Sequence, residues 1–177
     1  MPEPMGGRPR PRHLVVMGVS GCGKTLVAER LAGRLGLAFA EGDAHHPKEN
    51  VHKMAAGQPL SDEDRGPWLA ALVAWTRERD AEGMSTVISC SALKRRYRDV
   101  LREADPETFF VHLHADFEVL AERMRGRAHF MPISLLESQF GTLEPLAEDE
   151  PGVEVDVTPP VDEVMTVVEA AVRRHLG

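Results

Sequence analysis

The stretch that decides the fold is Gly18-Val-Ser-Gly-Cys-Gly-Lys-Thr25, which matches the pattern G-x-x-x-x-G-K-[ST]. An apolar run, residues 13–17, precedes it, and a helix-permissive stretch, residues 26–35, follows it. A phosphate-binding loop needs this order of strand, glycine loop and helix, because backbone N–H groups and the helix N-terminus together attract phosphate oxygens. A dinucleotide-binding loop is excluded, since Leu26 stands where its third glycine should be. The sequence therefore predicts a nucleoside triphosphate site, with Lys24 at the β- and γ-phosphates and the Thr25 hydroxyl on Mg²⁺.

The composition is that of an ordinary globular chain of 177 residues, which is one domain in length. A net charge of −7 argues against nucleic acid as the main partner, because a phosphate backbone needs a basic surface. No run approaches the ~18 apolar residues of a membrane helix. Cys22 and Cys90 form no disulfide or zinc pattern, which favours a reducing, cytoplasmic setting. We expect residues 1–12, rich in proline, arginine and glycine, to be a disordered tail before a single domain over residues 13–177.

Strand and helix signals alternate along the whole chain. This alternation predicts an α/β fold in three layers, with a five-stranded parallel sheet flanked by helices. We expect strands near residues 13–18, 37–40, 85–90, 108–114 and 153–157. The expected helices cover residues 24–35, 47–56, 61–81 and 92–103, a stretch from about 116, and residues 161–175. A glycine- and proline-broken segment over about 126–135 is expected to form a short lid.

Ligands of open parallel sheets bind beyond the carboxyl ends of the strands, so we expect site residues to follow the predicted strands. Asp43 follows the second predicted strand, where a carboxylate could orient or deprotonate an attacking hydroxyl, or hold Mg²⁺. The alternative for Asp43 is an N-cap ahead of the helix that begins at Pro47. The third predicted strand ends at Cys90 with no acidic residue, so a Walker B aspartate is missing there. That absence argues against a motor ATPase or a GTPase.

Two pairs of basic residues stand four positions apart, Lys94 with Arg98 and Arg123 with Arg127. We expect the first pair to bind an anionic group such as a carboxylate, with a solvated basic helix face as the alternative. We expect Arg123 and Arg127 to neutralise charge on the transferring phosphoryl group when the lid closes. The alternative is an ordinary interaction of these arginines with the dipole at the end of a helix. The rigid segment at residues 158–160 could form the wall of an adenine pocket.

Taken together, the motifs resemble those of the gluconokinase family of small P-loop kinases, over essentially residues 13–172. Besides the phosphate loop, the matching segments are Glu41-Gly-Asp-Ala-His-His-Pro47, Asn50-Val-His-Lys-Met54, Gly57-Gln-Pro-Leu-Ser-Asp-Glu-Asp-Arg65, Pro67-Trp-Leu69, Cys90-Ser-Ala-Leu-Lys94, Tyr97-Arg-Asp99, Arg123-Met-Arg-Gly-Arg127, His129-Phe130 and Gln139-Phe140. The resemblance implies a fold like that of nucleoside-monophosphate kinases, a homodimer, and ATP-dependent phosphorylation of D-gluconate at its 6-hydroxyl.

The resemblance also implies roles for residues. Asp43 would position the hydroxyl, and the substrate contacts would come from Asp43, His46, Lys53, Arg65, Lys94, Arg98 and His129. The expected nucleotide contacts are Gly18, Ser20, Gly21, Cys22, Gly23, Lys24, Thr25, Arg123 and Pro160, and the expected catalytic residues are Lys24, Asp43, Arg123 and Arg127. With no Walker B aspartate, Asp43 is expected to serve Thr25 and its Mg²⁺ as well.

Two alternatives stay open at this point. One is another small-metabolite kinase such as a shikimate kinase, although that family would show Asp-x-Asp after the second strand, where this chain has only Asp43. The other is a nucleotide-binding regulator without turnover.

Overall fold

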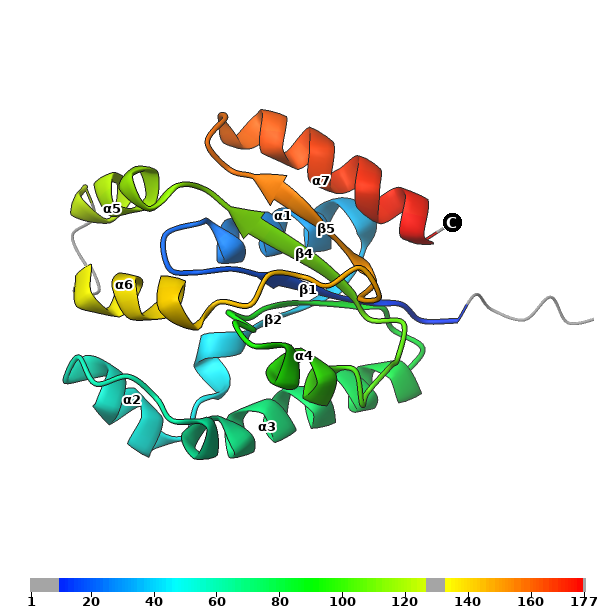
Figure 1. Cartoon of the computed structure of the whole chain (residues 1–177). Coiled ribbons are helices and arrows are strands. Elements are labelled where there is room, and N and C mark those ends of the chain that lie inside the picture. The colour runs from blue at the N-terminus through cyan, green and yellow to red at the C-terminus, as the bar shows by residue number, and fades with distance from the viewer. Residues whose placement is uncertain (1–9, 127–132, 177) are drawn as a thin grey trace, which may run out of the picture.

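A parallel sheet of five strands lies between two layers of helices in the computed structural model, which describes residues 10–126 and 133–176 (Figure 1). The strand order is β2-β3-β1-β4-β5, and every neighbouring pair is parallel. The strands are β1 His13–Met17, β2 Ala38–Glu41, β3 Thr86–Ser89, β4 Phe109–His114 and β5 Gly152–Asp156. The predicted α/β fold class is thereby confirmed.

The connections between strands are helical. The helices are α1 Lys24–Leu35, α2 Lys48–Ala55, α3 Asp62–Ala81, α4 Arg95–Leu101, α5 Phe117–Arg125, α6 Ile133–Thr142 and α7 Val161–Leu176, with a short 3₁₀ turn, η1, at Gly42–His45. Helix α3 begins at the capping box expected from the sequence, since the Ser61 hydroxyl accepts from the Asp64 N–H while the Asp64 carboxylate accepts from the Ser61 N–H. Within the described residues, no helix has both the length and the apolar character needed to cross a bilayer.

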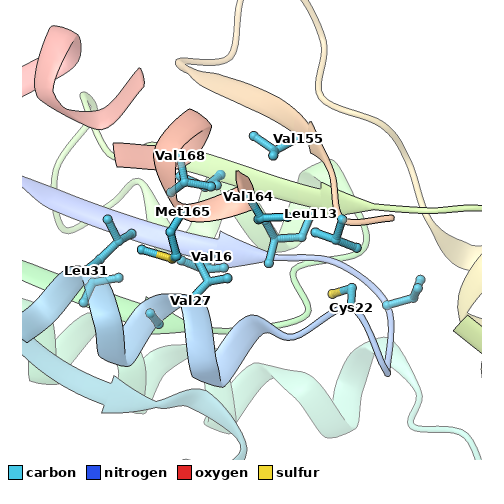
Figure 2. Packing of buried hydrophobic residues seen from close by; sticks show 14 of the residues in the cluster. Val16, Cys22, Val27, Leu31, Leu113, Val155, Val164, Met165 and Val168 are labelled. Atoms are coloured by element: carbon cyan, nitrogen blue, oxygen red, sulfur yellow. The ribbon is translucent and has the colours of Figure 1, made fainter. Parts of the chain in front are cut away.

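Strand β1 contributes side chains to two separate cores, because successive residues of a strand point to opposite faces of the sheet. Leu14 and Val16 pack on the face covered by α1 and α7 (Figure 2). Val15 and Met17 pack on the opposite face against α3 and α4. Burial on both faces explains why this strand reads as one continuous apolar run.

The helix expected over residues 92–103 begins later than predicted. Residues 90–94 form no helix, and Lys94 is the extended N-cap of α4. Ala92 adopts a φ of 45°, a left-handed conformation that residues with a side chain rarely take. Helix α6, which follows the predicted lid, was not among the expected helices, and lid residues 127–132 lie outside the described residues.

The last residues of the expected tail contact the domain. Arg10 pairs with Asp105 at 2.8 Å, and Arg12 pairs with Glu107 at 3.0 Å. Of the tail expected over residues 1–12, residues 1–9 lie outside the described part of the chain, while Arg10 and Arg12 already contact the turn before β4.

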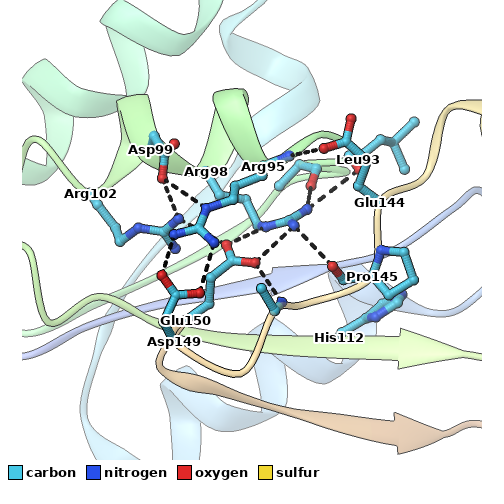
Figure 3. Close-up of polar contacts among 12 residues, drawn as sticks. Leu93, Arg95, Arg98, Asp99, Arg102, His112, Glu144, Pro145, Asp149 and Glu150 are labelled. Carbon is cyan, nitrogen blue, oxygen red and sulfur yellow. Dashed lines mark hydrogen bonds and ion pairs between the residues drawn. The ribbon is translucent and has the colours of Figure 1, made fainter.

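A buried ion pair joins α4 to the segment before β5 (Figure 3). The Arg98 Nε and the Glu150 Oε1 are 2.8 Å apart, and the two side chains are 0% and 1% exposed. Arg98 also donates to the Ala92 carbonyl at 2.9 Å, and Arg102 donates to Glu150 at 2.8 Å. Arg98 is therefore a structural residue, and its prediction as a substrate contact is wrong. The four-residue spacing of Lys94 and Arg98 predicted a shared helix face. Lys94 lies outside the helix, however, so the two side chains share no such face.

We expect Glu150→Gln to lower the free energy of unfolding by about 3–5 kcal/mol at pH 7, because it leaves the Arg98 charge buried without its partner. Burial alone raises the pKa of Glu150, but hydrogen bonds from Arg98, the Ala147 N–H and Arg102 outweigh it and lower the pKa to about 2. The ionised carboxylate therefore stabilises the fold fully above about pH 4.5, and this stabilisation is lost as the pH falls toward 2.

Urea denaturation of wild type and variant from pH 7 to pH 3 measures this difference, which should shrink below about pH 4.5. Asp149→Asn is the matched control, because the neighbouring carboxylate is 68% exposed and its solvent-screened pair with Arg95 contributes little to stability. A Glu150→Gln variant as stable as Asp149→Asn would contradict the assignment of Glu150 to a stabilising ion pair.

Candidate functional site

The phosphate loop turns sharply between β1 and α1, and its glycines permit this conformation. Gly18 has a φ of 144°, and a Cβ atom there would lie 2.5 Å from the Leu113 carbonyl oxygen. The Gly18 N–H donates to the Ser91 carbonyl at 3.2 Å, which fixes the loop to the segment after β3. The Lys24 ammonium group donates to the Val19 carbonyl at 3.2 Å. The loop thus has a fixed backbone, with the Lys24 ammonium group held beside it.

A carboxylate that sequence reasoning missed lies beside the loop. The Thr25 hydroxyl donates to Glu41 Oε1 at 2.8 Å, and Glu41 is the last residue of β2. The carboxylate that accepts from the Thr25 hydroxyl thus belongs to Glu41 and not to Asp43, the residue expected there. The metal role expected of Asp43 stays a prediction. The sequence did contain a signal for Glu41, since this residue directly follows the predicted strand 37–40 and stands two residues before Asp43.

The backbone between these two carboxylates approaches β3 closely. A Cβ atom at Gly42 would lie 2.2 Å from the Ser89 carbonyl oxygen, so only glycine fits there. Glu41 on the β2 side and Asp43 in η1 are consequently presented at the same end of the sheet, beyond the carboxyl end of β2.

One cavity, of about 380 Å³, brings six of the predicted site residues together. They come from the phosphate loop, η1 and its C-cap, α3 and the N-cap of α4, and they are Ser20, Lys24, Asp43, His46, Arg65 and Lys94. Residues of α6, including Gln139, also line this cavity. Three cationic side chains and two carboxylates, Asp43 and Asp62, line one hollow, which suits a small anionic substrate that also carries hydroxyl groups. We call this hollow the acceptor cavity.

Asp62 holds one cation of the acceptor cavity, Lys94, and Tyr97 lies between this pair and Arg65. Lys94 Nζ lies 3.1 Å from Asp62 Oδ1, and the Tyr97 hydroxyl donates to the same carboxylate. The Arg65 guanidinium lies 5.1 Å from the centre of the Tyr97 ring and donates to the Leu60 carbonyl at 2.6 Å. The hydrogen bonds from Tyr97 and then Lys94 lower the pKa of Asp62, and the hydrogen bond to Asp62 raises the pKa of Lys94. Both groups are therefore charged at neutral pH.

Lys53 does not line the acceptor cavity. Its ammonium group lies 2.8 Å from Asp64, and this hydrogen bond is the main cause that lowers the pKa of Asp64 to about 2. The structure thus gives Lys53 a carboxylate partner on α3, and its expected substrate contact stays a prediction. Two further expected residues, Arg127 and His129, lie outside the described residues.

A second cavity, of about 400 Å³, lies on the other part of the phosphate loop. Its lining combines Gly21, Cys22 and Gly23 with Arg123, Pro160 and apolar residues of α1, α7 and the segment after β5. Arg123 donates to the Val157 carbonyl at 2.6 Å, which fixes its guanidinium against that segment. The apolar walls suit a planar base, as expected for Pro160. We call this hollow the nucleoside cavity.

Helix α6 contacts the phosphate loop directly. Gln139 Oε1 accepts a hydrogen bond from the Ser20 backbone N–H at 2.7 Å. Gln139 was matched as part of a motif but was not expected in the site, since nothing in its spacing links it to a loop about 120 positions away.

The residues present fit a magnesium site of the kind that uses few protein ligands. Within the described residues, no three or more His, Cys, Asp or Glu side chains gather in one place. A magnesium site does not need such a group. Mg²⁺ commonly takes one or two protein oxygens, substrate phosphates and waters. The Thr25 hydroxyl and the Glu41 carboxylate beside it offer such oxygens.

Comparisons with known proteins agree with this geometry. A family model described as an AAA domain matches residues 14–131. The gluconokinase of Gluconobacter oxydans is 55% identical over 147 residues, which cover 82% of this chain and 83% of that protein. A crystal structure of a sugar kinase from Janibacter sp. superposes with a TM-score of 0.88 at 50% identity, covering 92% of this chain and 95% of that chain. A gluconokinase from Sinorhizobium meliloti gives a TM-score of 0.84 at 50% identity, with 94% of each chain covered.

Because its sequence identity to a curated gluconokinase exceeds one half over four-fifths of its length, the chain belongs to the gluconokinase family of P-loop kinases.

Proposed function

We propose that the protein transfers the γ-phosphoryl group of ATP to the 6-hydroxyl of D-gluconate, which yields 6-phospho-D-gluconate. The observation that carries this proposal is the acceptor cavity, in which the phosphate-loop Lys24 and the Asp43 carboxylate share one hollow with Arg65 and Lys94. The names of its relatives, gluconokinase in two organisms, support the same substrate.

The donor half of the reaction uses the phosphate loop and the nucleoside cavity. The loop N–H groups and Lys24 bind the β- and γ-phosphates, while the base enters the hollow beside Pro160. Thr25 and Glu41 hold Mg²⁺, which neutralises phosphate charge when it is bound. Lys24 and Arg123 interact with the charge that spreads over the transferring group, and Arg127 joins them from the lid.

The acceptor half uses the other cavity. Arg65 and Lys94 bind the gluconate carboxylate, since charged donors at a shared wall suit a carboxylate group. Asp43 orients the 6-hydroxyl and accepts its proton. Proton abstraction is a smaller contribution than positioning, because phosphoryl transfer passes through a loose transition state.

We also propose that the chain works as a homodimer in the cytoplasm. The two cysteines of the chain, Cys22 and Cys90, are both buried and unpaired, which suits a reducing compartment.

ADP release measured with a panel of acceptors tests the proposed reaction. We expect turnover with D-gluconate to exceed that with other sugar acids and with shikimate by at least about tenfold, because one mismatched polar contact costs that much in a site built for hydrogen bonds. Preferred turnover with shikimate would favour the alternative kinase, and nucleotide binding without turnover on any acceptor would favour a regulator.

Asp43→Asn should lower kcat with gluconate by about 10²-fold, at the lower end of what a positioned general base contributes. ATP binding should be unchanged, because Asp43 lies in the acceptor cavity and not in the nucleoside cavity. Steady-state kinetics and nucleotide titration measure the two effects separately. Asp149→Asn serves as control, since its exposed carboxylate lines neither cavity; equal kcat values for the two variants would refute the role of Asp43.

Glu41→Gln should raise the Mg²⁺ concentration for half-maximal activity by about 10–100-fold, the usual effect of removing a partner of a metal ligand. Activity at saturating Mg²⁺ should recover in large part. Titrations of Glu41→Gln and Asp43→Asn with Mg²⁺ compare the two carboxylates. A shift for Asp43→Asn alone would return the metal role to Asp43.

A further inference from the structure

We propose that Asn50 is a positioning residue for phosphoryl transfer, because it holds His46 as the neutral tautomer whose Nε2–H faces Asp43. The proposal rests on the proposed function only in so far as Asp43 and His46 line the acceptor cavity.

The orientation of the Asn50 amide is set by a backbone carbonyl. Asn50 is 3% exposed, and its Nδ2 lies 2.7 Å from the carbonyl oxygen of Asp64 on α3. A carbonyl oxygen can only accept a hydrogen bond, so the amide atom that faces it must be the nitrogen. The side-chain amide therefore has one allowed orientation.

The amide in turn sets the tautomer of His46. The same Nδ2 lies 3.1 Å from His46 Nδ1. An amide nitrogen carries two hydrogens and accepts none, so one hydrogen goes to Asp64 and the other goes to the ring. His46 Nδ1 must then accept, and the single proton of the neutral imidazole sits on Nε2.

The protonated nitrogen faces the catalytic carboxylate. His46 Nε2 lies 4.0 Å from Asp43 Oδ1, which is too long for a direct hydrogen bond and short enough for an acceptor hydroxyl or a water to join the two. The His46 side chain is 3% exposed and that of Asp43 is 67% exposed, so a rigid donor lies beside an accessible carboxylate. Through such a bridging hydroxyl or water, this donor orients the Asp43 carboxylate.

The surroundings keep the ring neutral and fixed. The ring stacks on Trp68, with centroids 4.1 Å apart and planes 16° apart. Trp68 itself donates to the Gly42 carbonyl at 2.7 Å, next to Asp43 in the chain. Burial lowers the pKa of His46; the Asp43 charge opposes this and the Arg65 charge adds to it, so the pKa remains below its ordinary value of 6.5.

Asn50 has a structural contact as well, because its amide connects α2 to α3 through Asp64. A loss of activity in a variant would not by itself separate the two roles. To separate the positioning role from the structural role, His46 must be replaced by a residue whose side chain has no tautomers. Glutamine in place of His46 provides one, since its amide nitrogen can occupy the place of Nε2 and always donates.

The first experiment reads the tautomer directly in the wild-type chain. Long-range ¹H–¹⁵N NMR correlations distinguish Nε2–H from Nδ1–H, and the His46→Gln spectrum identifies the His46 signals among those of the eight histidines. We expect a protonated Nε2 and an unprotonated Nδ1. A proton on Nδ1 in the wild-type chain would overturn the proposal. This reading involves no substrate, so it stands even if the acceptor panel rejects gluconate.

The second experiment is a double-mutant cycle. Asn50→Leu removes the donor without adding a charge, so Nδ1 is free to carry the proton and kcat should fall by about tenfold, the loss of one bridged hydrogen bond at the Asp43 carboxylate. In the His46→Gln background the same change should leave kcat within about twofold, because no tautomer remains to be shifted.

Unfolding by urea, measured on all four proteins, controls for the contact with Asp64. A structural role alone predicts that Asn50→Leu lowers kcat by the same factor in both backgrounds and lowers the free energy of unfolding equally in both. That result would overturn the proposal. A loss of kcat confined to the His46 background supports it.

Discussion

The buried ion pair between Arg98 and Glu150 supports the segment that connects the phosphate loop to the acceptor cavity. Arg98 donates to the carbonyl of Ala92, whose left-handed backbone costs on the order of 1 kcal/mol. That bend places the Ser91 carbonyl on the Gly18 N–H of the phosphate loop, and it leaves Lys94 outside α4, where it lines the acceptor cavity. One interaction in the core thus fixes a residue of the loop and a residue of the substrate wall.

The phosphate loop separates two hollows with different chemistry. The nucleoside cavity has mostly apolar walls, whereas the acceptor cavity gathers Lys24, Arg65 and Lys94 around Asp43. The chain as a whole carries a net charge of −7, so the cations of the acceptor cavity stand out locally against an acidic protein. Such a local cluster attracts a small anion without a basic surface, which is consistent with a metabolite as substrate rather than a polyanion.

The fold and the phosphate loop could be predicted from sequence because they depend on local patterns. The apolar run of β1, the glycine spacing and the capping box at Ser61 each act within a few residues. The start of α4 could not be predicted, since a left-handed Ala92 has no sequence signal and depends on Arg98 and on Glu150, some fifty positions away.

The site was predictable in part for the same reason. Asp43 could be inferred from its place after a strand, and Glu41 could have been, because it ends that strand. The roles of Asn50 and Gln139 depend on contacts across the fold, Asn50 with the backbone of α3 and Gln139 with the backbone of the phosphate loop. Spacing along the chain contains no information about such contacts.

The contact of Gln139 with the phosphate loop has an energetic consequence for the nucleotide. The Ser20 N–H is already satisfied by a side-chain oxygen, so a phosphate that takes this N–H displaces Gln139 rather than only solvent. The displaced amide lies on α6, the helix that follows the lid segment and lines the acceptor cavity. Nucleotide binding therefore competes with a contact made by a helix that also lines the acceptor cavity.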